Sequence, residues 1–185
     1  MSEVNVEPAL VERAQRGDRE AFAQLAQESS NRLFAIASRI LRDFDAAGDA
    51  LQGALVLIWR DLPTLRDATK FDAWTYRLLV RVCHEELRRR RRLGARDMWP
   101  SDEVADDDTF AVQQRDELER AFTRLSSDHR AVIVLQYYSD LTVPQIADAL
   151  GVSEGTVKSR LHYARGALRG ALEANARVAI QERTA

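Results

Sequence analysis

The sequence lacks the features of secreted and membrane proteins. Cys83 is the single cysteine among 185 residues, which excludes an internal disulfide and a cysteine-based zinc cluster and fits a reducing cytosol. The longest apolar run, residues 54–59, is far shorter than the ~20 residues that a membrane span requires. Polar and acidic residues interrupt the first thirty positions, so no signal peptide is expected. We therefore expect a cytoplasmic protein without membrane insertion.

Strand and turn signals are also scarce. The chain has only eight glycines and four prolines, with few alternating β-branched residues, so the predicted fold class is all-α. Apolar residues at helical spacing predict amphipathic helices over residues 10–15, 18–29, 31–41, 46–61 and 71–92. Residues 62–70 contain Pro63 and no sustained period, which predicts a loop. A second helical unit is predicted from Gln113 onward.

Charge is balanced overall but divided along the chain. The formal net charge is −2, yet residues 77–96 hold eight arginines against two glutamates, and residues 97–108 hold six acids and no base. Local charge, rather than net charge, decides where a polyanion docks. The acidic stretch predicts a flexible linker. The five consecutive arginines at 88–92 fit either a solvated helix end or a phosphate-binding site.

The most informative run is residues 141–165, LTVPQIADALGVSEGTVKSRLHYAR, which predicts two short helices joined by a turn. Thr142 and Gln145 form a capping box, and Gly151 suits the end of the first helix. Ser153 is the predicted cap of the second helix. The run therefore predicts a helix-turn-helix, although capping and periodicity alone would fit any helical hairpin.

The second helix of this pair has an apolar side and a basic side. Val157, Leu161 and Ala164 follow the helical spacing and should pack inward. The same spacing places Lys158, Arg165 and Arg169 along one flank, and Thr156 and Arg160 near the other. Residues 155–172 contain four basic side chains and no acid, as expected for a helix in the major groove beside phosphates. This distribution of charge favours a DNA-reading helix over a solvated one, which usually mixes both signs.

No catalytic or metal site is predicted. The chain has no phosphate-cradling glycine loop, no paired-carboxylate metal site at a recognisable spacing, and no nucleophile with its base. His162 has no ligand-spaced partner, because His84 and His129 are far away in the sequence. We expect a protein that is not an enzyme and needs no cofactor and no metal.

Taken in order, these parts resemble a bacterial RNA polymerase sigma factor of the sigma-70 family, in its two-domain extracytoplasmic-function (ECF) group. Residues 10–22, LVERAQRGDREAF, are similar to the first helix of sigma domain two. The runs AGDALQGALVLIWRDLP and FDAWTYRLLVRVCHEELRRRRR resemble its polymerase-binding and promoter-melting helices. Residues 141–168 are similar to the helix-turn-helix of sigma domain four.

The resemblance implies two small helical domains. Residues 1–93 would form a domain-two-like unit that binds core polymerase and the −10 element, and residues 113–177 a domain-four-like unit that binds the −35 element. A linker over residues 94–112 and a tail over 178–185 complete the division. The implied function is promoter-specific transcription initiation, and the alternative is a stand-alone helix-turn-helix transcriptional regulator.

The resemblance also assigns residues to the first unit. The 46–61 helix would dock on the polymerase clamp helices, although Gly48 and Gly53 stand where the family commonly has acids. Residues 62–70 and the next helix would capture the melted non-template strand, with Arg81 where the family often has asparagine. Trp74 fits core packing equally well. The assigned residues are Asp49, Gln52 and Val56 for core polymerase, and Phe71, Trp74, Tyr76, Arg77, Arg81, Arg88 and Arg89 for the −10 element and melting.

In the second unit, the resemblance implies contacts to the upstream element. Base edges or the groove would meet Lys158, Ser159, His162 and Tyr163, and phosphates would meet Thr156, Arg160 and Arg165. The implied partners are RNA polymerase core, through its clamp helices and flap, promoter DNA in double-stranded and melted form, and an anti-sigma protein.

Overall fold

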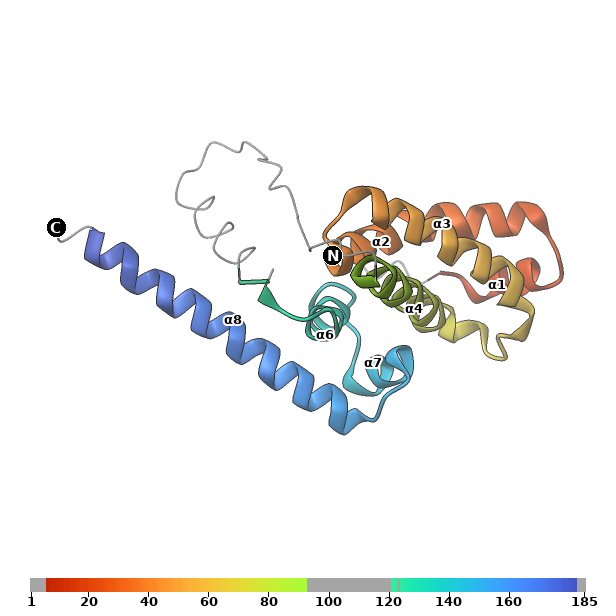
Figure 1. Ribbon diagram of the computed structural model, residues 1–185. Coiled ribbons are helices and arrows are strands. Elements are labelled where there is room, and N and C mark those ends of the chain that lie inside the picture. The colour runs from red at the N-terminus through yellow and green to blue at the C-terminus, as the bar shows by residue number, and fades with distance from the viewer. Residues whose placement is uncertain (1–5, 93–120, 123, 183–185) are drawn as a thin grey trace.

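The computed structural model describes residues 6–92, 121, 122 and 124–182, and every regular element within these ranges is helical (Figure 1). The all-α prediction is therefore confirmed for this part of the chain. The predicted linker over 94–112 and the predicted start of the second unit at Gln113 lie outside the described residues. The helices are α1 (Pro8–Gln15), α2 (Arg19–Leu41), α3 (Phe44–Asp61), α4 (Phe71–Arg92), α6 (Ser127–Tyr137), α7 (Val143–Leu150) and α8 (Glu154–Glu182).

Helix α2 is the longest element of the N-terminal unit. Asp18 caps its first turn, because the Asp18 Oδ1 atom accepts a hydrogen bond of 3.0 Å from the Ala21 backbone N–H. The predicted helices over 18–29 and 31–41 form one helix without a break, since nothing between them interrupts the buried face. That face carries Leu25, Leu33 and Ile40, which are buried in the core of the unit.

Helices α3 and α4 pack against α2 and against each other. Helix α3 begins two residues before the predicted start at Ala46, because Asp43 accepts a hydrogen bond of 2.8 Å from the Ala46 N–H and so defines the first turn. The small buried face of α3, with Ala47, Ala50 and Ala54, allows close packing of the neighbouring helices.

The segment between α3 and α4 is more ordered than a plain loop. Two short 3₁₀ helices, η1 (Leu62–Thr64) and η2 (Ala68–Lys70), occupy most of it. Gln15 at the end of α1 donates hydrogen bonds from Nε2 to the carbonyl oxygens of Leu62 and Leu65, at 3.1 and 2.6 Å. The end of α1 thus fixes the path of the segment that leads into α4.

The C-terminal unit contains the predicted helix-turn-helix with the predicted caps. The Thr142 N–H donates to Gln145 Oε1 at 2.8 Å, which is the glutamine half of the capping box. Gly151 ends α7 in the left-handed conformation, with φ of 65°. Ser153 Oγ accepts from the Thr156 N–H at 3.2 Å at the start of α8. Val157, Leu161 and Ala164 are buried, as the spacing predicted.

The two units pack against each other rather than standing apart. Helix α4 lies against α7, and α2 lies against α6. Buried apolar residues of both units belong to one hydrophobic cluster. Figure 1 shows α8 running from the turn after α7 past α6 and away from the N-terminal bundle.

Candidate DNA-binding and polymerase-binding surfaces

One flank of α8 presents a basic row beside a groove. The groove has a volume of about 460 Å³ and lies between α8, the end of α6 and the start of α7. Arg165 is held at its edge, because Nη2 donates to Gln136 Oε1 of α6 at 2.7 Å. The residues that line the groove include three cationic side chains and a histidine, namely Lys158, Arg165, Arg169 and His162. This flank can present positive charge to phosphates and the His162 ring to a base edge.

The other candidates of α8 lie on its opposite flank, or their side chains form hydrogen bonds within the first turns of the helix. Tyr163 is 67% exposed and stacks on the His129 ring of α6, with centroids 6.5 Å apart. Thr156 pairs its hydroxyl with Ser153 in the cap, and the Ser159 hydroxyl donates to the Thr156 carbonyl at 2.9 Å. The structure therefore divides the seven predicted −35 contacts between two flanks of one helix.

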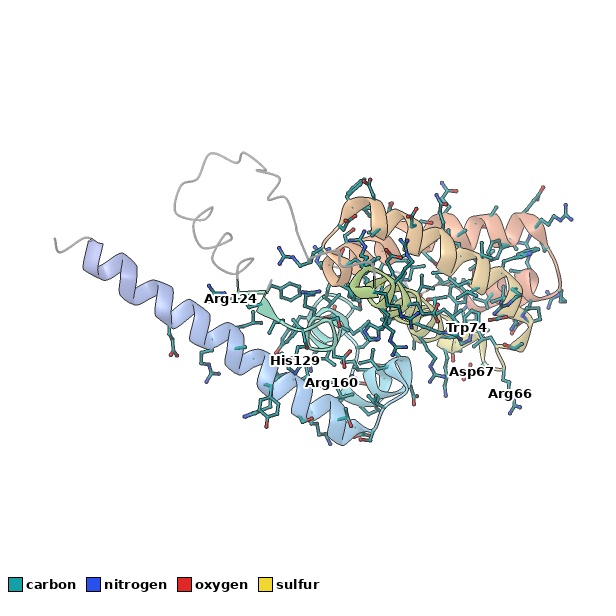
Figure 2. The ribbon with its side chains drawn as sticks, in the orientation of Figure 1. Arg66, Asp67, Trp74, Arg124, His129 and Arg160 are labelled. Carbon is teal, nitrogen blue, oxygen red and sulfur yellow. The ribbon has the colours of Figure 1, made fainter. Side chains whose placement is uncertain are left out.

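Arg160 is engaged inside the protein. Its Nη2 atom donates to Asp128 Oδ2 at 2.6 Å, and the other oxygen of Asp128 lies 3.5 Å from His84 Nε2 of α4. Figure 2 shows Arg160 and His129 close together where α8 passes α6. A phosphate contact by Arg160 would compete with this ion pair.

The aromatic candidates for strand capture are unequally placed. Phe71 and Tyr76 are each 2% exposed, so neither ring presents a face to solvent in this arrangement. Trp74 is half-buried and packs near Phe71, with ring centroids 6.3 Å apart. Figure 2 shows Trp74 at the same end of the bundle as Asp67 and Arg66, and Arg66 points outward. Of the three rings, Trp74 alone retains access to a base.

The basic candidates of α4 are exposed, and three of the four are engaged. Arg77 donates from Nε to the Asp148 carbonyl at 2.6 Å. Arg81 pairs with Glu85 at 3.0 Å, and Arg89 pairs with Glu86 at 2.8 Å. Surface pairs within one helix are weak, at about 0.3–0.5 kcal/mol, so Arg81 and Arg89 can exchange them for phosphates. Arg88 is exposed as well.

The exposed face of α3 carries all three candidates for polymerase binding. Asp49 and Gln52 are exposed, and Val56 is 65% exposed. Phe44 and Trp59 also expose large apolar surface on this helix, although the Trp59 ring contacts Phe22 edge-on at 4.6 Å. A helix face that combines exposed apolar and polar groups is typical of a protein-binding surface.

Known proteins with similar sequences identify the family to which this chain belongs. The family model "Sigma-70 region 2" matches residues 25–93, and the model "Sigma-70, region 4" matches residues 115–168. The ECF RNA polymerase sigma factor SigM of Mycobacterium tuberculosis is 34% identical over 155 residues, which cover 82% of this chain and 77% of SigM. This chain is an ECF sigma factor of the sigma-70 family. The family prediction is thereby confirmed.

Other relatives and solved structures of sigma factors agree. SigL of M. tuberculosis is 34% identical over 154 residues, covering 80% of this sigma factor and 87% of SigL. The structure of CnrH in complex with the cytosolic domain of CnrY matches with a TM-score of 0.64 and 25% identity, over 90% of this chain and 97% of CnrH. RpoE of Bartonella quintana, solved with the anti-sigma factor NepR, has the same fold, with a TM-score of 0.64 and 24% identity over 82% of this chain and 96% of RpoE.

Two residues that matter in this sigma factor were not predicted from the sequence. Arg169 lines the basic groove, although the sequence had placed it on the flank of Lys158 and Arg165 without assigning it a DNA contact. Arg130 is 4% exposed within the apolar run of α6. A charged residue inside such a run was a usable signal, because a buried guanidinium requires partners.

The part of this sigma factor that the structure describes has neither a cluster of metal ligands nor a membrane-spanning helix. Within it, no three His, Cys, Asp or Glu side chains gather as metal ligands. In the same residues, no helix is both long and apolar enough to cross a membrane.

Proposed function

We propose that this sigma factor binds core RNA polymerase through α3 and contacts promoter DNA through α8 and the start of α4. The observation that carries the proposal is the exposed mixed face of α3, together with a basic flank on the recognition helix of a helix-turn-helix. One face suits a protein partner and the other a polyanion. The division into units over residues 1–93 and 113–177 belongs to the same proposal.

The −35 element would be read from the groove flank of α8. Lys158 and His162 are the base-edge candidates there, with Arg165 and Arg169 beside them for phosphates. Tyr163, Ser159, Thr156 and Arg160 remain candidates of second rank, because each is engaged within the unit or lies on the other flank. Lysine and histidine side chains can both meet acceptors of guanine in the major groove.

The −10 element would be captured at the end of the bundle where Trp74 lies. Trp74 supplies a ring for base stacking, which is worth about 1–3 kcal/mol per base. Arg77, Arg81, Arg88 and Arg89 would follow the strand backbone along α4. Phe71 would support the Trp74 ring from the core, and Tyr76 would become available only if its cover were removed.

An anti-sigma protein is the third proposed partner. CnrH was solved with the cytosolic domain of CnrY, and RpoE of B. quintana with the anti-sigma factor NepR. Both matches extend over most of this chain, which supports a partner of the same kind. The proposed location is the cytoplasm, and the proposed activity involves no covalent chemistry.

Association with core polymerase tests the proposal directly. The full chain should form a stoichiometric complex with purified core in size-exclusion chromatography. Val56→Glu should weaken that complex about tenfold or more, because it places an unpaired charge in an apolar contact. Ala23→Glu on the exposed side of α2 is the matched control and should leave it intact. A chain that binds DNA but never core would instead be the stand-alone regulator.

A further inference from the structure

Gln15, at the end of α1, holds the segment between α3 and α4 through both protons of one amide group. Its Nε2 atom donates to the Leu62 carbonyl at 3.1 Å and to the Leu65 carbonyl at 2.6 Å. The Leu62 carbonyl also accepts from the Leu65 N–H at 3.1 Å, which closes the turn of η1. Gln15 is half-buried, so these bonds are partly shielded from water. One side chain therefore fixes both ends of η1.

The backbone on the other side of Arg66 is held as well. Asp67 Oδ1 accepts from the Thr69 N–H at 3.0 Å and from the Thr69 hydroxyl at 2.6 Å, and these bonds cap η2. Helix α1 packs against both η1 and η2. Arg66 thus lies between two fixed points, the Leu65 carbonyl that Gln15 holds and the cap at Asp67.

The Arg66 side chain, in contrast to its backbone, is not engaged. Arg66 is exposed, and its guanidinium has no hydrogen bond or ion pair with any residue that the structure describes. Figure 2 shows Arg66 pointing outward at the end of the bundle where Trp74 lies. Arg77 and Arg81 of α4 differ, because each is already paired. Arg66 can therefore bind a phosphate without giving up a contact within the described part of the protein.

We propose that Arg66 contacts a phosphate of the captured strand next to the base that stacks on Trp74, and that Gln15 is the positioning residue that holds Arg66 there. The inference rests on the proposed function, because strand capture beside Trp74 is itself a proposal. Gln15 acts without touching the strand. Its two hydrogen bonds order residues 62–70 before the strand arrives, and a segment that must first be ordered on binding lowers the affinity.

Hydrogen exchange in the full chain tests the positioning role. Gln15→Met keeps the length of the side chain and removes both donors, so the backbone amides of residues 62–70 should exchange about tenfold faster. Gln15→Lys should keep their slow exchange, because its ammonium group can donate to both carbonyls. Gln24→Met is the matched control, since Gln24 is exposed and donates to Glu28 of the same helix. Unchanged exchange in Gln15→Met would overturn the positioning role.

Single-strand binding by the complex of the full chain with core polymerase tests the phosphate contact. The probe is a fluorescein-labelled pool of random single-stranded oligonucleotides, because phosphate contacts carry no sequence information, and core alone is the blank. Arg66→Gln should weaken binding about tenfold and reduce the slope of log affinity against log salt by about 0.7, the value for one phosphate of a single strand. Arg19→Gln, at an exposed arginine of α2, is the charge control and should change neither. A loss of affinity with an unchanged salt slope would overturn the phosphate contact.

A double-mutant cycle distinguishes positioning of Arg66 from a general loss of stability. If Gln15 acts through Arg66, then Arg66→Gln should weaken strand binding less in the Gln15→Met chain than in the unchanged chain. Equal losses in the two backgrounds would refute the coupling. Circular dichroism checks folding, and Gln15→Glu, whose carboxylate cannot donate, serves if Gln15→Met does not fold.

The same binding measurement separates this inference from the proposed function. An unchanged chain that forms no complex with core, or whose complex binds no single strand, would contradict the proposed function and the Arg66 contact together. Strand binding by the unchanged chain that survives both Gln15→Met and Arg66→Gln would contradict this inference alone.

Discussion

Asp43 links the cap of α3 to the arginine run of α4. Its Oδ1 atom accepts the Ala46 N–H, and its Oδ2 atom accepts from Arg90 Nη1 at 2.9 Å. Arg90 also pairs with Glu86 at 2.8 Å. The hydrogen bond from Arg90, followed by the one from the Ala46 N–H, holds the pKa of Asp43 below its ordinary value. At least one arginine of the run is therefore structural.

Asp43→Ala should destabilise the fold by about 1–2 kcal/mol, because it removes a helix cap and a partly exposed ion pair. Asp45→Ala, in the same first turn, should destabilise the fold by only a few tenths of a kcal/mol. Because the folded pKa of Asp43 is lowered, its contribution is present above its ordinary pKa and is lost as pH falls through the folded value. Urea titrations from about pH 6 to about pH 3 should show a shallower loss of stability in Asp43→Ala. An unchanged pH slope would contradict this role.

Gly48 and Gly53 differ in what surrounds them. A Cβ atom at Gly48 would meet nothing within 4 Å, whereas one at Gly53 would lie 3.4 Å from Val82 Cγ1 of α4. Gly48→Ala should therefore raise the free energy of unfolding by about 0.5–1 kcal/mol, the helix propensity difference. Gly53→Ala should raise the free energy of unfolding by less. Equal gains in thermal melts of the two variants would contradict the difference in packing.

The first turns of α8 were well predicted from sequence, because their information is local, but the helix is not short as predicted and continues to Glu182, into the predicted tail. Capping by Ser153, the turn at Gly151 and the inward spacing of Val157 and Leu161 depend on neighbouring residues alone. The partners of its outward residues are not local. Arg160 meets Asp128, and Arg165 meets Gln136, over 32 and 29 positions. Helical spacing could therefore place the basic residues on two flanks of the helix, but it could not identify the distant partners that engage Arg160 and Arg165.

The groove flank of α8 should carry upstream-element binding. Lys158→Ala and His162→Ala should each weaken binding to the −35 element by about 1–3 kcal/mol, as for loss of a base contact, and leave core association intact. Arg169→Ala should weaken binding to all sequences and reduce its salt dependence. Arg124→Ala, on an exposed arginine of the same unit, controls for net charge (Figure 2). An equal loss of core binding in the Lys158 variant would contradict the separation of surfaces.

The segment between α3 and α4 shows a limit of local prediction. Pro63 and the missing period correctly marked the end of α3. The 3₁₀ turn η1 was not foreseen, because the side-chain hydrogen bonds that hold it come from Gln15, 47 and 50 positions away. The turn η2 has a local cap, since Asp67 Oδ1 accepts from the Thr69 N–H at 3.0 Å, but it was not predicted either. Local prediction also failed for the aromatic rings of α4. Helical spacing alone did not distinguish Tyr76, which is buried, from Trp74, which is half-buried.

At the scale of the whole molecule, the resemblance identified both units and their order, and the family matches confirm them. It did not indicate that the units pack together. Contacts between the units include those of Arg130, Arg39 and Arg77, each of which has a partner in the other unit. Such contacts have no signature in periodicity or capping. They also determine which candidate residues are available before any partner binds.

Run-off transcription with purified core polymerase tests the central claim most directly. A library of double-stranded templates with randomised −35 and −10 regions would be transcribed with the full chain, and the transcripts sequenced. We expect transcripts that depend on the chain and are enriched for one motif in each region. Lys158→Ala should relax the motif in the upstream region alone. Transcription that is unchanged when the chain is omitted, or enriched for no motif, would contradict the account.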